Sequence, residues 1–450
     1  MNNENNKLNA LILSVGGTYE PLVTCVKEFK PDFIYFLHSE GTLKIAKEVI
    51  ERTAFNGNTK FKELYNPESL EESFYKSRLI IQELKHENFN VFMDFTGGTK
   101  PMVAGLVLAA VGENIEYSYV GTSSKEGRDK NGLGIVKDGF EQVKKQKDPF
   151  DLYAVIEFNR GKEFFNKYQF QAARKNFQQA QSKLDEPYLK KISQLYLKIV
   201  NIYDSWDKFN IELTNEDNST IYLSKAFNNI LKLIDEDETI LNTFQKDNEG
   251  FLTQLEDNRI FLENKISTKN KPNKNNIYFY LPDLLNNAYR RIEEGKYDDA
   301  VARLYRIMEL VAQLKLNTLG IVDENSIKNF KFDINKIAFK DFTPDNYEAI
   351  LDKLNINNFD HPKPTFTLSM YNDFNMLRYL NDDLGLHYIK DGKVKRELEK
   401  RNSSVLAHGL RPVNEINALK LYDYSLEYAR ILCPNIDKYI KMSQFPKFII

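Results

Sequence analysis

Short apolar segments that alternate with helix-like segments constrain the fold of residues 1–147 most strongly. Residues 8–17 and 31–39 are apolar, rich in β-forming side chains, and end in glycine or polar residues. Residues 89–98 have the same form, and residues 115–122 are a fourth candidate strand. The stretches between these segments have helix-like patterns at 40–52, 67–86 and 99–112. This alternation predicts an α/β domain with a mostly parallel sheet that is covered by helices on both faces.

Helical patterns replace the strand patterns after Pro149. Residues 155–184 resemble a helical hairpin of the tetratricopeptide type, and Trp206 with its aromatic neighbours is expected to be core. Residues 269–276 contain no apolar side chain and one proline, which indicates a linker. Apolar residues recur at helical spacing through 289–316, which predicts an all-α C-terminal domain. We therefore expect three domains, at 1–147, 148–276 and 277–450.

The charge balance and the cysteine count exclude several classes of protein. The 450 residues carry 62 Lys+Arg and 64 Asp+Glu, so the net charge is −2. A wholly basic nucleic-acid coat is excluded, although a local basic patch is not. Two cysteines supply neither a disulfide framework nor a cysteine-based zinc site. The longest apolar run, 102–111, is too short to span a bilayer, and no signal peptide is evident, so we expect a cytoplasmic protein without membrane contact.

Two loops that contain Gly-Gly-Thr follow predicted strands. The sequence DFTGGTKPM (94–102) runs from a strand into a helix, and SVGGTYEP (14–21) ends the first strand. Glycines allow a ligand to approach the backbone, and the amides at a helix start attract anions. At the carboxyl ends of parallel strands the two loops would form one polar crevice. The candidate residues for binding phosphate or ribose are Ser14, Gly16, Gly17, Thr18, Thr96, Gly97, Gly98, Thr99 and Lys100.

The alternative is that both loops are tight turns in which glycine is needed only for the backbone conformation and no ligand binds. The spacing of a P-loop is absent, and no G-x-G-x-x-G follows the first strand. An ordinary enzyme that uses NAD or ATP is therefore the least favoured class. The histidines at positions 38, 86, 361 and 387 lack the spacing that metal ligands need, so we propose no metal site.

A second cluster, RNSSVLAHG (401–409), contains Arg401 and His408 seven residues apart. On a helix this spacing places both side chains on one face, about 10 Å apart along the axis. A histidine exchanges protons near neutral pH, and an arginine stabilises a five-coordinate phosphorus. The pair suits metal-independent cleavage of RNA by its own 2′-hydroxyl. The alternative is a histidine that only balances a helix dipole.

The charge around this cluster is locally positive. Residues 388–411 hold seven Lys or Arg against three Asp or Glu, a local charge of +4. Such a patch attracts a polyanion, although it also suits a solvated helix face. Arg306 and Glu309, on another amphipathic stretch, either form a structural ion pair or orient Arg401 and His408.

Together the two motifs resemble a known family. The loop DFTGGTKPM resembles the signature of the CARF domain, the Rossmann-like sensor of cyclic oligoadenylates in type III CRISPR defence. RNSSVLAHG resembles the R-x(4–6)-H signature of HEPN ribonucleases, with Asn402 as the polar residue that often follows the arginine. The order, with the CARF motif first and the HEPN motif last, is similar to that of the CARF–HEPN ribonucleases.

This resemblance implies an endoribonuclease of antiviral defence that cuts single-stranded RNA and leaves 2′,3′-cyclic phosphate ends. Residues 1–147 would be the sensor, 148–276 a connector and 277–450 the HEPN ribonuclease domain. Arg401 and His408 would be catalytic, with Asn402 as a helper, and the activator, a cyclic tetra- or hexa-adenylate, would bind the two glycine loops. The family acts as homodimers without cofactors. Some of its sensor domains also cleave their activator, and the sequence leaves that open.

The sequence is compatible with two rival functions. The first is an adaptor that senses a cyclic nucleotide and whose helical domain binds RNA or a protein without cleaving. The second is a sensor with a DNA-cleaving output, which the absence of a convincing PD-(D/E)xK arrangement in the C-terminal third disfavours.

Overall fold

The computed structural model describes residues 7–128, 136–214, 219–247, 250–270, 277–321, 332–333, 365–402, 404–405 and 409–450. The chain divides into two compact units. The first comprises Met1–Phe158 and Gln179–Lys191, and the second comprises Asn159–Gln178 and Ile192–Ile450. The three-domain division at 147 and 276 stays a prediction, and most of the expected linker, residues 271–276, lies outside the described residues.

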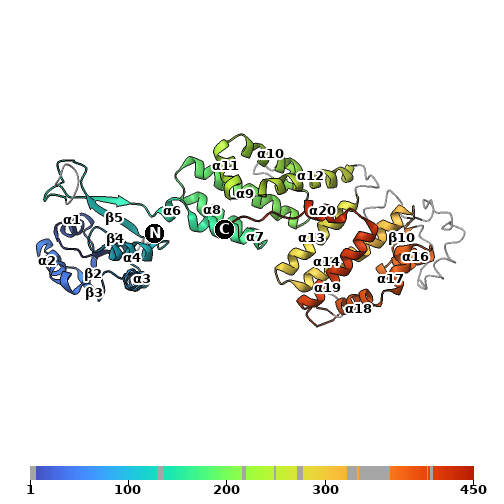
Figure 1. The fold of residues 1–450 in the computed structure, drawn as a ribbon, viewed down its shortest axis with the longest axis horizontal. Helices are drawn as coiled ribbons and strands as arrows, with labels where there is room; N and C mark the ends of the chain where they lie inside the picture. Colours follow the sequence, from blue (N-terminus) through green and yellow to red (C-terminus); the bar gives the residue numbers. More distant parts are fainter. Residues whose placement is uncertain are drawn as a thin grey trace, which may run out of the picture. The chain divides into compact units, whose positions relative to one another are not determined.

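A mostly parallel sheet forms the centre of the first unit (Figure 1). Across the described residues it has six strands, in the order β3-β2-β1-β4-β5-β6. The strands are β1 (Asn9–Ser14), β2 (Phe33–Ser39), β3 (Asn58–Leu64), β4 (Asn90–Asp94), β5 (Glu116–Gly121) and β6 (Gln142–Gln146). Strands β1 to β5 pair in parallel, and β6 pairs antiparallel with β5. The predicted α/β fold with a mostly parallel sheet is confirmed.

Helices cover both faces of this sheet because successive side chains of its central strands point to opposite sides. Ala10 and Ile12 of β1 join one apolar core, and Leu11 and Leu13 join the other. The first core is completed by α3 (Leu70–His86) and α4 (Lys100–Ala110). The second is completed by α1 (Glu20–Phe29) and α2 (Leu43–Thr53). A strand that is buried on both faces is apolar throughout, which explains the continuous apolar runs of the sequence.

Sequence patterns missed the two strands at the edges of the sheet. Strand β3 (NTKFKEL) has only two apolar residues, Phe61 and Leu64, and most of its side chains are at least partly exposed. Strand β6 (QVKKQ) is similarly polar. An edge strand faces solvent along one side and often carries charged residues, which weakens the apolar signal that marks a buried strand.

Helices make up most of the chain between the sheet and the C-terminal region. The elements are α6 (Pro149–Leu152), α7 (Val155–Asn166), α8 (Phe170–Lys183), α9 (Pro187–Asp207), α10 (Leu223–Asp235), α11 (Glu238–Asp247), α12 (Phe251–Asn270) and the short strands β7 (Glu212–Thr214) and β8 (Thr220–Tyr222). The expected pair of helices over 155–184 is confirmed as α7 and α8. A Cβ atom on Gly161 would lie 2.5 Å from the ring of Phe177, so this close approach requires glycine.

A helical core forms the C-terminal part of the second unit. Its elements are η2 (Ile277–Phe279), α13 (Tyr280–Glu293), α14 (Tyr297–Thr318), α16 (Met370–Tyr379), α17 (Asp383–Lys390), α18 (Gly392–Asn402), α19 (Glu415–Leu432), α20 (Ile436–Met442) and the short pair β9 (Phe332–Asp333) and β10 (Thr365–Phe366). The apolar positions expected from the helical spacing are buried together on α13 and α14, namely Ile292, Ala300, Leu304, Ile307, Leu310, Val311 and Leu314. Throughout the described residues, no helix is both long and apolar enough to cross a bilayer.

The last residues of the chain leave α20 and pack among the helices of the middle region (Figure 1). The rings of Phe445 and Tyr203 lie 4.7 Å apart, and those of Phe448 and Phe251 lie 4.5 Å apart. The side-chain amide of Asn166 donates to the backbone carbonyl of Phe448 at 2.8 Å and accepts from its backbone N–H at 2.7 Å. Trp206 belongs to the same aromatic cluster and is buried, as expected. The C-terminal tail is therefore part of a hydrophobic core.

Candidate functional site

The two Gly-Gly-Thr loops lie side by side at the carboxyl edge of the sheet. Strands β1 and β4 are parallel neighbours, with Leu13 opposite Asp94. The hydroxyl of Ser14 at the end of β1 donates to the carbonyl of Gly97 at 2.5 Å. The order of the strands reverses between β1 and β4, and open α/β sheets form a ligand crevice at such a point. The predicted adjacency of the loops is confirmed.

Glycine is required where the two loops touch. A Cβ atom on Gly16 would lie 2.7 Å from the backbone nitrogen of Gly98. A Cβ atom on Gly97 would lie 2.5 Å from the carbonyl oxygen of Ser14, and Gly98 has a φ of +97°. Gly17 differs, because a Cβ atom there would meet nothing within 4 Å. Gly16 and Gly97 thus set the spacing of the loops, and Gly17 faces open space.

This difference predicts unequal effects of adding one methyl group. Gly97→Ala should destabilise the protein by about 1–3 kcal/mol, because the added atom collides with backbone. Gly17→Ala should change the free energy of unfolding by less than about 0.5 kcal/mol. Urea unfolding followed by circular dichroism measures both values, and an equal loss in the two variants would contradict the contact between the loops.

The buried carboxyl group of Asp94 forms hydrogen bonds at the start of the loop that follows β4. Asp94 accepts hydrogen bonds from the backbone N–H of Thr96 at 2.9 Å and from the hydroxyl of Ser118 at 2.8 Å. Burial raises the pKa of Asp94, since the loss of solvent outweighs these hydrogen bonds. The hydroxyl of Thr96 in turn accepts from the backbone N–H of Val120 at 2.7 Å. These contacts fix the loop against β5.

A cleft of about 360 Å³ opens beside the two loops. Six of the predicted ligand residues line it: Gly16, Gly17, Thr18, Thr96, Gly97 and Gly98. The other three predicted residues, although described, are not among its lining. Ser14 is fully buried, Thr99 caps α4 and donates to the carbonyl of Pro67, and Lys100 is exposed at the start of α4.

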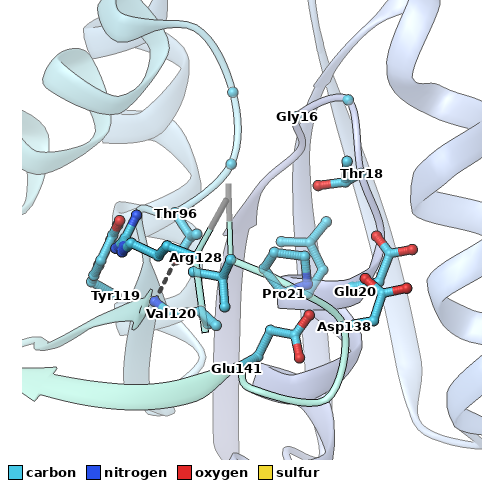
Figure 2. Close-up of a pocket in the computed structure, with 15 residues that line it drawn as sticks. Gly16, Thr18, Glu20, Pro21, Thr96, Tyr119, Val120, Arg128, Asp138 and Glu141 are labelled. Atoms are coloured by element: carbon cyan, nitrogen blue, oxygen red, sulfur yellow. Dashed lines mark hydrogen bonds between the residues drawn. The ribbon is translucent and has the colours of Figure 1, made fainter. Parts of the chain in front are cut away.

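The remaining walls of the cleft come from residues without a recognisable motif. Figure 2 shows Tyr119 and Arg128 on one side and the carboxylates of Glu20, Asp138 and Glu141 on the other. The polar segment between β5 and β6 contains three of these residues, Arg128, Asp138 and Glu141. Nothing in that segment marks it as binding, so sequence reasoning missed these residues. The cleft therefore offers backbone, hydroxyl, aromatic and charged groups together.

In the helical core, Arg401 lies in the last turn of α18. Its guanidinium carbon lies 4.2 Å from the centre of the Tyr305 ring on α14, a cation–π contact. On the same helix, Arg306 forms an ion pair with Glu309 at 2.6 Å and also donates to Gln313 at 2.9 Å. The expected ion pair between Arg306 and Glu309 is present.

The expectation that 401–409 forms one helix is wrong. Helix α18 ends at Asn402, and Ser404 forms an isolated parallel bridge with Arg411. The backbone N–H of Gly409 donates to the carbonyl of Ser404 at 3.0 Å. Asparagine and serine in general favour helix ends, because their side chains compete for backbone hydrogen bonds. His408 lies outside the described residues, so the helical-face argument for its pairing with Arg401 no longer applies.

Within the ranges described, no group of three or more His, Cys, Asp and Glu side chains is placed to hold a metal ion. His38, at the end of β2, is buried, and its Nδ1 lies 2.9 Å from the carbonyl oxygen of Ser39. Its contacts are those of a core histidine.

Comparison with known proteins bears on both parts of the chain. Residues 269–432 match the family model described as the Csm6 HEPN domain. The chain is similar to the solved structure of Enterococcus italicus Csm6 bound to cyclic hexa-2′-fluoro-hexa-dAMP, with a TM-score of 0.51 and 13% identity. That similarity covers 97% of this chain and 98% of the other. No curated protein sequence matches the chain.

Two further structures match partially. A type III CRISPR defence DNA nuclease activated by cyclic oligoadenylate is 15% identical, with a TM-score of 0.24, over 43% of this chain and 33% of that chain. Can2 from Sulfobacillus thermosulfidooxidans in complex with cyclic tetra-adenylate is 11% identical, with a TM-score of 0.23, over 47% and 74%. These partial matches are too weak to bear on the fold. Residues 269–432 therefore correspond to a HEPN domain, and the whole chain shares the fold of Csm6.

Proposed function

We propose that the protein is an endoribonuclease of type III CRISPR defence that cuts single-stranded RNA without a metal when a cyclic oligoadenylate binds its sensor domain. The observation that carries the proposal is the match of 269–432 to the Csm6 HEPN domain, because this range contains both Arg401 and His408. The sensor would be residues 1–147, the connector 148–276 and the nuclease domain 277–450.

The cleft beside the glycine loops is the proposed activator site. Its volume of about 360 Å³ suits one small ligand group, such as a single nucleotide. A ring of four or six nucleotides exceeds one such cleft, which supports a homodimer that shares one ring between two copies. Backbone groups of Gly16, Gly97 and Gly98 would approach the phosphates closely. The analogue bound to Enterococcus italicus Csm6 makes the hexa-adenylate the first activator to test.

The proposed chemistry uses a histidine and an arginine. His408 takes the proton from a ribose 2′-hydroxyl, and that oxygen attacks the adjacent phosphorus. Arg401 stabilises the extra negative charge of the five-coordinate phosphorus, and Asn402 assists. The 5′-oxygen of the next nucleotide leaves and is protonated, so the products carry a 2′,3′-cyclic phosphate and a 5′-hydroxyl. Activator binding would raise activity by favouring the arrangement of two HEPN domains in which these groups meet.

The contact between Arg401 and Tyr305 predicts a role for the aromatic ring. Tyr305→Leu should lower kcat about tenfold, because a cation–π contact contributes about 0.5–2 kcal/mol to holding the guanidinium in place. Tyr305→Phe keeps the ring and should stay within about twofold of the wild-type kcat. Activator-dependent cleavage of a labelled RNA measures both variants. A Phe variant as impaired as the Leu variant would contradict a role based on the ring face.

A panel of activators tests the proposed function. Cyclic tri-, tetra- and hexa-adenylate are each assayed for binding and for stimulated cleavage of labelled single-stranded RNA. We expect one ring size to bind and to stimulate cleavage. Binding without cleavage under every activator would support an adaptor instead, and cleavage of DNA in place of RNA would contradict the ribonuclease assignment.

A further inference from the structure

Three of the seven basic residues in the positive stretch 388–411 converge on one cleft. Lys400, Arg401 and Arg411 line a cavity of about 260 Å³ between the end of α18, the start of α19 and α14. Other basic residues of the stretch bond to nearby backbone instead. Lys395 donates to the carbonyl of Ile389, and Arg396 donates to that of Gly392. Among its described residues, the cleft beside Arg401 therefore holds three basic side chains and one acidic side chain.

Backbone contacts at Arg411 itself and at Val413 hold Arg411 next to this cleft. Arg411 forms the parallel bridge with Ser404, which ties its backbone to the segment that follows Arg401. Two residues later, the backbone N–H of Val413 donates to the carboxylate of Asp298 at 3.1 Å, which anchors the segment to α14. An exposed arginine on an anchored backbone is suited to binding a ligand, because only its side chain must be ordered.

The charges and the apolar groups of the cleft suit a phosphodiester. Among the described residues that line it, Glu397 is the one acidic side chain, and Lys400 already bonds to both of its carboxylate oxygens at 2.8 and 3.0 Å. Val301, Val413 and Leu421 supply an apolar wall. A guanidinium binds a phosphate through two parallel hydrogen bonds, and the apolar wall can contact a ribose or a base.

We infer that this cleft is a second phosphate-binding position for the RNA substrate, in which Arg411 holds the phosphodiester next to the one that is cleaved. The inference rests on the proposed function, since it assigns Arg401 to the scissile phosphate. Consecutive phosphates of one RNA strand would then contact Arg401 and Arg411, which line the same cavity. Arg411 contributes to substrate binding, and the bond-breaking step does not need it.

Binding of an uncleavable RNA tests the inference without requiring catalysis. A labelled oligonucleotide of fully 2′-O-methylated RNA lacks the attacking hydroxyl, and fluorescence anisotropy gives its Kd on the full-length protein over a range of KCl concentrations. Arg411→Gln should raise the Kd about tenfold at low salt. It should also lower the slope of log K against log salt by about 0.7, the value for one phosphate contact on a single strand. Arg378→Gln, which removes an exposed arginine of α16 outside the cleft, is the matched control and should bind as wild type.

The outcomes separate the inference from the proposed function. An Arg411→Gln protein with wild-type Kd and salt slope overturns the second phosphate position, even if the wild type cleaves RNA. Weaker binding in this variant, with the control unchanged, supports the position even if no activator induces cleavage. With a cleavable RNA, the variant should show a KM raised about tenfold at unchanged kcat, and a lowered kcat at unchanged KM would overturn the assignment to binding.

Discussion

The His408→Ala variant is expected to lose activator-dependent RNA cleavage by roughly 10²–10⁴-fold, because proton transfer by a positioned side chain contributes an acceleration of that size. Activator binding should be unchanged, since the proposed activator cleft is lined by residues of the sheet domain and the segments that follow its strands. Arg401→Ala should lose cleavage by about 10²–10³-fold through the loss of transition-state stabilisation. Initial rates on a labelled RNA at saturating activator measure both effects.

A histidine from the same helical core supplies the control. His387 lies on α17 with 43% of its side chain exposed, and its Nε2 lies 3.7 Å from a carboxylate oxygen of Glu427. His387→Ala removes an imidazole of the same type and should leave the cleavage rate within about twofold of wild type. If His408→Ala cleaved RNA at the wild-type rate, the assignment of His408 as the general base would be contradicted. A similar loss in both histidine variants would point to a general loss of structure.

The second large effect concerns the C-terminal tail. Phe445→Ala should lower the free energy of unfolding by about 3–5 kcal/mol, the usual cost of truncating a buried phenylalanine. The ring of Phe445 contacts Tyr203 and Trp206 at centroid distances of 4.7 and 5.1 Å, and the guanidinium of Arg290 lies 3.8 Å from its centre. Removal of this ring would leave a cavity where the tail meets the middle helices. The single tryptophan of the chain, Trp206, reports the unfolding by its fluorescence during a urea titration.

An exposed neighbour in the tail is the matched control for this variant. Ile449 has 54% of its surface exposed, and Ile449→Ala should change the free energy of unfolding by less than about 0.5 kcal/mol. If Phe445→Ala were as stable as Ile449→Ala, the tail would not contribute to the core. If the tail is part of the core, its deletion should expose the same aromatic cluster and lower the urea midpoint further than Phe445→Ala does.

The parts of the fold that sequence could predict are those in which one physical signal dominates. Strands β1 and β2 are buried on both faces, and their short apolar runs with β-forming side chains reflect that burial. The adjacency of the glycine loops followed from the same sheet, because parallel strands end at a common edge. Helix α14 was predictable since its buried residues recur at helical spacing. In each case the local pattern and the tertiary environment agree.

The parts that sequence missed depend on contacts between distant segments. Arg128 and Glu141 line the cleft together with loop residues that lie far earlier in the sequence, and no local pattern reveals that contact. Phe445 and Phe448 carry no motif, and their burial depends on ring contacts with helices that lie far earlier in the chain. The end of α18 at Asn402 was also missed. There the spacing of Arg401 and His408 was interpreted on a helix, whereas α18 ends at Asn402 and Ser404 bonds in a local bridge.

Analysis of the RNA products in EDTA tests the central claim most directly. The full-length protein is incubated with labelled single-stranded RNA, with and without cyclic hexa-adenylate, and the termini of the fragments are determined by mass spectrometry. We predict cleavage that depends on the activator, persists in EDTA and yields fragments with 2′,3′-cyclic phosphate and 5′-hydroxyl ends. Cleavage that EDTA abolishes, or fragments with 5′-phosphate ends, would contradict the proposed attack by the 2′-hydroxyl.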